Sequence, residues 1–109
     1  MWLMTTRGFY SIVEDFHDRD QLLVRARVRE DLGAVADLVP GLEVEETPER
    51  DYRFRASVAR DVWASAVAQL AREIDYPNFK NAVAERQGVD RAHVYGDVWA
   101  TLLELQQPR

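Results

Sequence analysis

Two stretches of the chain alternate between apolar and polar side chains, a period of two that is typical of strands with one buried face. They cover residues 22–28 and 52–58. An aromatic and β-branched stretch at residues 8–14 precedes the first, and residues 42–46 alternate before the second. Short polar segments separate the members of each pair, so the pattern predicts two antiparallel hairpins.

Apolar residues at spacings of three and four predict a helix after each hairpin. The first apolar stripe consists of Leu32, Val35 and Val39, and Pro40-Gly41 ends this helix. The second stripe consists of Trp63, Val67, Leu70 and Ile74. We expect both helices to cover the apolar face of the sheet.

The two hairpin–helix segments resemble each other. Shifting the sequence by thirty places superposes residues 24–28 on 54–58 and Asp31 on Asp61. This predicts a duplicated strand–strand–helix unit (ββαββα), with copies at about residues 8–39 and 42–74. The predicted fold class is therefore α+β, with an antiparallel sheet of about four strands and helices on one face.

A helical tail at about residues 78–107 follows the repeat. Pro77 stops the long helix, and Asn78 is placed to cap a short helix that ends at Gly88. The last helix carries an apolar stripe that we expect to face inward, formed by Val94, Val98, Leu102 and Leu105. The prediction is one domain over residues 1–109.

Composition narrows the classes of protein. Apolar residues make up 47% of the 109 residues and charged residues 30%, which favours a globular domain over a disordered chain. The absence of cysteine excludes a disulfide framework, a thiolate metal site and a cysteine nucleophile. No apolar run approaches the roughly 20 residues that span a bilayer, so we expect a soluble cytoplasmic protein that does not enter membranes.

Basic charge is carried almost entirely by arginine. The net charge is −5, which disfavours a nonspecific polyanion binder. Strand parity nevertheless places four arginines on the face of the sheet opposite the helices, where guanidinium groups could hold phosphates or carboxylates. They are Arg25, Arg27, Arg53 and Arg55. Glu43 and Glu45 share that face, so a cross-strand charge ladder is the alternative interpretation.

Two other features suggest contact sites. The start of the predicted short helix gathers Asn78 and the single lysine, Lys80, where an anion could bind; a capped turn is the simpler interpretation. Trp2 and Trp99 are candidate exposed anchors for a protein partner, or else caps of the core.

Catalytic and metal-binding patterns are not found in the sequence. His17 lies in the first hairpin loop and His93 in the last helix, and neither has a partner at a metal-ligand spacing. The five glycines are scattered, so no phosphate-binding loop is predicted. We predict no catalytic residues, no metal and no cofactor, and we lean against an enzyme.

Several segments of the chain look familiar. They are residues 1–5 and 8–13, residues 23–27 and 51–55, residues 74–80, and Tyr95 with Val98-Trp99. Together they resemble a family of small uncharacterised bacterial proteins. The resemblance implies a bacterial origin and carries no activity with it.

The sequence favours a non-catalytic binding or regulatory module that acts through protein contacts, including contacts with a second copy of itself. A nucleic-acid or nucleotide binder using the arginine face is the first alternative. A small enzyme with a site of carboxylates and a histidine is the second.

Overall fold

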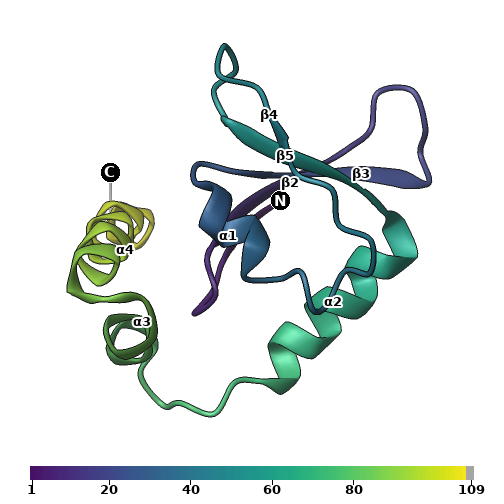
Figure 1. Ribbon diagram of the computed structural model, residues 1–109. Helices are drawn as coiled ribbons and strands as arrows, with labels where there is room; N and C mark the ends of the chain where they lie inside the picture. The colour runs from purple at the N-terminus through teal and green to yellow at the C-terminus, as the bar shows by residue number, and fades with distance from the viewer. Residues whose placement is uncertain (108–109) are drawn as a thin grey trace. The chain divides into compact units, whose positions relative to one another are not determined.

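The computed structural model describes residues 1–107, which form two compact units. The first unit runs from Met1 to Ile74, and the second begins at Asp75. Figure 1 shows the sheet with α1 and α2 in the first unit and a helical hairpin in the second.

The first unit is built on one antiparallel sheet of five strands, in the order β1-β2-β3-β5-β4. The strands are β1 (Trp2–Met4), β2 (Phe9–Glu14), β3 (Gln21–Ala26), β4 (Glu45–Glu46) and β5 (Phe54–Ala59). The α+β class and the antiparallel pairing are confirmed. The prediction of about four strands is one short, because β1 adds an edge strand that sequence analysis missed.

Helices α1 (Arg29–Gly33) and α2 (Arg60–Arg72) lie on the same face of this sheet (Figure 1). The helix predicted around residues 32–39 is wrong in extent, since α1 ends at Gly33 and the chain continues through i→i+3 turns such as Val35 N–H to Leu32 O. Its predicted apolar stripe is nevertheless fully used, because Leu32, Val35 and Val39 are all buried.

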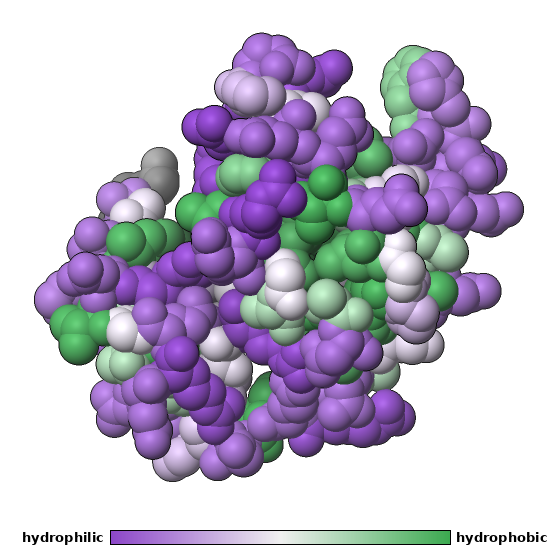
Figure 2. Space-filling model, viewed as in Figure 1, coloured by the Kyte–Doolittle hydropathy of each residue, from purple (hydrophilic) through white to green (hydrophobic). Residues whose placement is uncertain are grey.

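The core lies between the sheet and these helices. Figure 2 shows apolar residues gathered in this layer where the view looks into it. Of the six residues that strand parity predicts to face inward, Val24, Ala26, Ala56 and Val58 are buried, whereas Val28 and Phe54 are half-buried. From α2, Trp63 enters the core and meets the ring of Tyr10 edge-on at 5.9 Å.

After β1, the element order is strand, strand, helix, repeated once. The two halves differ in size, because α1 has 5 residues and α2 has 13, and the predicted strand at residues 42–46 pairs only at Glu45–Glu46. The duplication of one unit stays a prediction.

The turn that joins β1 to β2 is tied closely to α1. Within it, Thr5 N–H bonds to Gly8 O at 2.9 Å, and Thr5 Oγ1 accepts from Gly8 N–H at 3.0 Å. The buried Asp31 then accepts a bond from Phe9 N–H at 3.0 Å, while its backbone oxygen accepts the Tyr10 hydroxyl at 2.6 Å. Asp31 therefore joins α1 to the start of β2.

Arg7, in the same turn, joins three further segments. It donates to Glu73 just after α2, to Asp37, and to the backbone oxygen of Ala34. These hydrogen bonds raise the pKa of Arg7, and the Arg7 guanidinium lowers the pKa of the Asp37 carboxyl. The turn is thereby held against the ends of both helices.

The second unit contains α3 (Phe79–Gln87), α4 (Val89–Leu102) and a short 3₁₀ helix, η1 (Leu103–Gln106). The predicted cap is confirmed, since Asn78 Oδ1 accepts from Asn81 N–H at 2.9 Å, and Gly88 ends α3 with a φ of 99°. The last helix is confirmed, but the prediction of its inward face is wrong. Ala92 and Tyr95 are buried, whereas most of the predicted inward stripe, Val94, Leu102 and Leu105, is exposed.

Replacing Gly8 tests the close packing of the β1–β2 turn. A Cβ at Gly8 would lie 2.6 Å from Asp31 Cγ, so we expect Gly8→Ala to lower the free energy of unfolding by about 1–3 kcal/mol. Gly33→Ala is the matched control, because nothing lies within 4 Å of its Cβ position and a gain of about 0.5–1 kcal/mol is expected. Urea unfolding of both variants measures the difference; equal stabilities would contradict this packing.

Removing the Arg7 guanidinium should destabilise the fold in a pH-dependent way. We expect Arg7→Met to lower the free energy of unfolding at pH 7 by about 1–3 kcal/mol, because it removes charged hydrogen bonds. Since the pKa of Asp37 is lowered in the folded state, its contribution is present above its unfolded pKa and is lost as the pH falls.

The difference in the free energy of unfolding between wild type and Arg7→Met should accordingly narrow below about pH 4. Urea unfolding at pH 7, 4 and 3 tests this, with Arg72→Met as a control on an exposed arginine of α2. A difference that stays constant over this range would show that Asp37 does not contribute.

Candidate functional site

The face of the sheet opposite α1 and α2, here called the open face, is the candidate site. The strand register places five residues in one row across it, one from each strand. In order from β1 to β4 they are Trp2, Ser11, Arg25, Arg55 and Glu45. The open face therefore has an aromatic side toward β1 and a charged side toward β4.

Three of the four predicted arginines gather around the ring of Tyr52. The guanidinium carbons of Arg25 and Arg27 lie 4.8 Å and 4.2 Å from the ring centroid, at distances suited to cation–π contact. Arg55 donates to the backbone oxygen of Tyr52 at 3.4 Å. Tyr52 is 4% exposed, in keeping with its ring being covered by the guanidinium groups of Arg25 and Arg27.

These arginines also bind the loop that precedes β5. Arg27 donates to the backbone oxygen of Asp51, and Arg55 donates to Thr47 Oγ1 at 3.2 Å. Arg25 turns toward β2, where it donates to Ser11 Oγ at 2.8 Å. Arg27 and Arg55 thus hold loop 47–53 against the sheet by hydrogen bonds to Asp51, Tyr52 and Thr47.

Arg53 differs from the other three in its partner, because it pairs with the carboxylate of Glu46 at 2.7 Å; Arg53 and Arg27 are both exposed. Within residues 1–107, no carboxylate forms an ion pair with Arg25, Arg27 or Arg55. Glu45 nevertheless lies opposite Arg55 in the strand register, so the alternative of a charge ladder with Glu43 and Glu45 stays an interpretation. A role for the four arginines in binding a ligand stays a prediction.

The aromatic side of the open face forms an apolar patch of four residues: Trp2, Phe9, Val13 and Leu23. The Trp2 ring is 73% exposed and meets the Phe9 ring edge-on at 6.0 Å. Val13, which is 38% exposed, lies directly opposite Leu23 in the register. Sequence analysis noted Trp2 as an anchor but missed this patch, because the register of β2 against β1 was unknown.

The hairpin between β2 and β3 carries a further exposed ring. Figure 2 shows apolar colour at its tip, where Phe16 is 94% exposed. His17, beside it, contacts the Phe16 ring edge-on, and its backbone N–H bonds to Asp15 Oδ1 at 2.8 Å. The carboxylates of Asp15 and Asp18, on either side of His17, accept hydrogen bonds from backbone N–H groups of the turn, so their role is structural.

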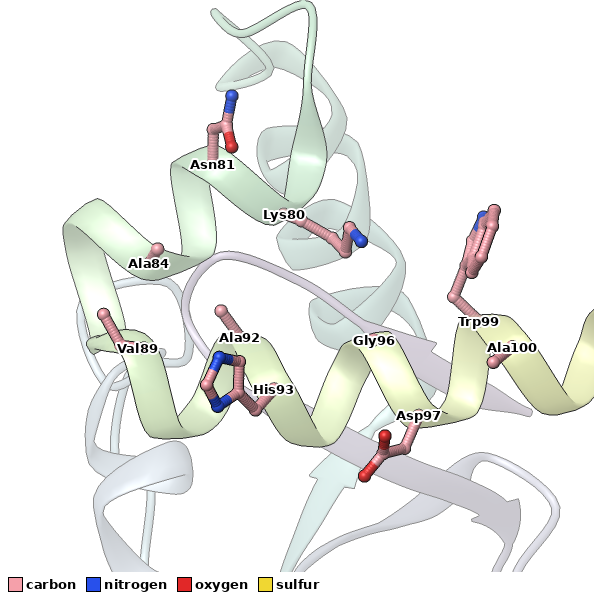
Figure 3. Close-up of a pocket in the computed structure, with 10 residues that line it drawn as sticks. All are labelled: Lys80, Asn81, Ala84, Val89, Ala92, His93, Gly96, Asp97, Trp99 and Ala100. Atoms are coloured by element: carbon pink, nitrogen blue, oxygen red, sulfur yellow. The ribbon is translucent and has the colours of Figure 1, made fainter.

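Asn78 and Lys80 lie in the second unit. Asn78 caps α3, and Lys80 extends toward the Trp99 ring, with Nζ 5.2 Å from its centroid (Figure 3). Between α3 and α4 is an open groove of about 420 Å³, lined by Lys80, His93, Asp97 and Trp99 among others. The capped-turn interpretation of Asn78 agrees with these contacts, and binding of an anion near Lys80 stays a prediction.

Neither a metal-ligand cluster nor a membrane-spanning helix is found among the described residues. In the part of the chain that the structure describes, no three His, Cys, Asp or Glu side chains come together as a metal site would require. No helix within residues 1–107 combines the length and the apolar character needed to cross a bilayer.

Comparison with known proteins found no match to a family model, to a curated protein or to a solved structure. The resemblance to a family of small bacterial proteins therefore stays a prediction.

Two arginine variants separate a structural role from surface charge. We expect Arg27→Met to lower the free energy of unfolding by about 1 kcal/mol, because the Asp51 carbonyl and the Tyr52 ring lose a partner. Arg53→Met, the matched control, removes an exposed ion pair, and a change below about 0.5 kcal/mol is expected. Urea unfolding measures both; a larger loss for Arg53→Met would contradict the structural role of Arg27.

Proposed function

We propose that this protein is a non-catalytic binding module whose apolar patch contacts a protein partner. The observation that carries the proposal is the exposed Trp2, whose ring meets Phe9 edge-on, on the same sheet face as the cross-strand pair Val13 and Leu23. Tryptophan is the residue type most enriched among binding hot spots, and a group of adjacent apolar side chains on a surface is typical of an interface.

The alternative of nucleic-acid binding is less favoured by the same geometry. A phosphate-binding sheet needs guanidinium groups that are available to the ligand, whereas Arg25, Arg27 and Arg55 spend several donors on Ser11 and loop 47–53. The net charge of −5 also works against a polyanion. The patch does supply the aromatic rings that such a sheet uses for stacking, so this alternative remains an outcome of the test.

Two exposed tryptophans provide a matched test. Wild type, Trp2→Ser and Trp99→Ser serve as bait for proteins identified by mass spectrometry, and each identified partner is then purified and titrated by calorimetry. Trp2 is 73% exposed and Trp99 60%, so neither change should disturb the core. We expect Trp2→Ser to weaken binding at least tenfold and Trp99→Ser to leave it unchanged. The reverse order would contradict the proposal.

Fluorescence polarisation of short labelled oligonucleotides, at low and moderate salt, addresses the alternative. Salt-sensitive binding that Trp2→Ser weakens would reassign the patch to nucleic acid. Absence of binding at low salt would remove nucleic acid as the ligand of the patch.

A further inference from the structure

The two edges of the sheet differ in how they are protected against pairing with another strand. At one edge, β4 has only two residues, Glu45 and Glu46, and their charge opposes strand addition. At the other, β1 lies within the segment Met1-Trp2-Leu3-Met4-Thr5-Thr6, whose side chains are all uncharged and which contains no proline. The β1 edge is also short, but it carries neither a charged side chain nor a proline.

The hydrogen bonds of β1 determine which of its backbone groups face outward. Met1 and Ile12 exchange both N–H···O bonds, each at 2.8 Å. Because bonded and non-bonded pairs alternate along an antiparallel ladder, Leu3 also bonds toward β2. The N–H and C=O groups of Trp2 and Met4 must then point away from β2, toward the free edge of the sheet.

We propose that β1 pairs antiparallel with β1 of a second copy, around a two-fold axis that passes between the two Leu3 residues. In this register Trp2 lies opposite Met4 of the second copy, and the two pairs exchange four backbone hydrogen bonds. The result is one continuous sheet of ten strands, twice the five of a single copy. The proposal rests on the proposed function, because Trp2 belongs to the apolar patch.

Side chains fit this register on both faces. On the open face, each exposed Trp2 ring packs on Met4 of the second copy, whose thioether makes favourable contacts with aromatic rings. On the helix-covered face, Leu3, which packs against the core, meets Leu3 of the second copy and continues the apolar layer. Because the segment is complementary to itself, the same surface serves both copies.

Pairing of β1 with β1 of a second copy suits this edge better than pairing of β1 with β4 of a second copy. Pairing β1 with β4 of another copy would be head-to-tail and would continue without closing, whereas the two-fold contact closes at two copies. Four hydrogen bonds and a few side chains bury less than the roughly 1,000 Å² of a stable interface. We therefore expect a weak dimer, which forms as the concentration rises through the micromolar range.

Introduced cysteines test the register directly, because the protein has none of its own. Leu3 would face its copy as a non-bonded pair, with Cα atoms about 4.5 Å apart, within the range of a disulfide. Leu3→Cys should form a covalent dimer under mild oxidation at least tenfold faster than Thr6→Cys. In the same register, the two Thr6 residues lie six positions apart, roughly 20 Å.

Sedimentation velocity over a wide concentration range provides the second measurement. Met4→Pro removes an outward N–H, and with it two of the four bonds in the dimer, while leaving the bonds to β2 in place. Met4→Val keeps this N–H and is the control. We expect wild type and Met4→Val to sediment faster as concentration rises, and Met4→Pro to remain monomeric with an unchanged circular dichroism spectrum.

Two results would overturn this pairing: a wild type that stays monomeric at several hundred micromolar, or a dimer that Met4→Pro leaves intact. If Trp2→Ser still weakens binding of an unrelated purified protein, the proposed function stands and only the second copy is rejected. If β1 pairs as described while no other partner depends on Trp2, the second copy is the partner.

Discussion

The position of β1 depends on the contact between the turn at Thr5–Gly8 and the buried carboxylate of Asp31. A three-residue strand contributes few ladder bonds of its own, so its place is fixed by what holds the turn. Gly8 allows Asp31 to approach closely enough to bind Phe9 N–H, and Arg7 fastens the same turn to the ends of both helices. The apolar patch and the free edge of the sheet both exist because this turn is fixed.

The arginine side of the open face shows how a charged surface can be part of the fold. Guanidinium groups are weakly hydrated and planar, so Arg25 and Arg27 can lie against the Tyr52 ring and still donate hydrogen bonds from their edges. Strand parity was sufficient to predict that these residues share a face. It could not predict that loop 47–53 folds back onto them, because that depends on contacts far apart in the sequence.

The sequence predicted best where one face of a strand is buried and the other is not. Residues 22–28 and 52–58 alternate clearly, and they contain most of β3 and β5, although β3 ends at Ala26 and β5 begins only at Phe54. Strand β1 was missed because Trp2–Met4 is too short and too uniformly apolar to show a period. In α4 the helical period was predicted correctly, but the predicted buried face was wrong, since Ala92 and Tyr95 are buried and Val94 is exposed. The helix has more apolar positions than the segments packed against it cover, so the period alone could not select the buried ones.

An exposed tryptophan and an uncharged sheet edge are both unfavourable in a protein that stays alone in water, since each promotes association. Here they occur at one corner of the first unit, where β1 supplies both. The opposite edge carries Glu45 and Glu46, and the arginines near it are occupied by loop 47–53. Because the Trp2 ring and the free β1 edge lie at the same corner, a single partner bound along β1 would cover both at once.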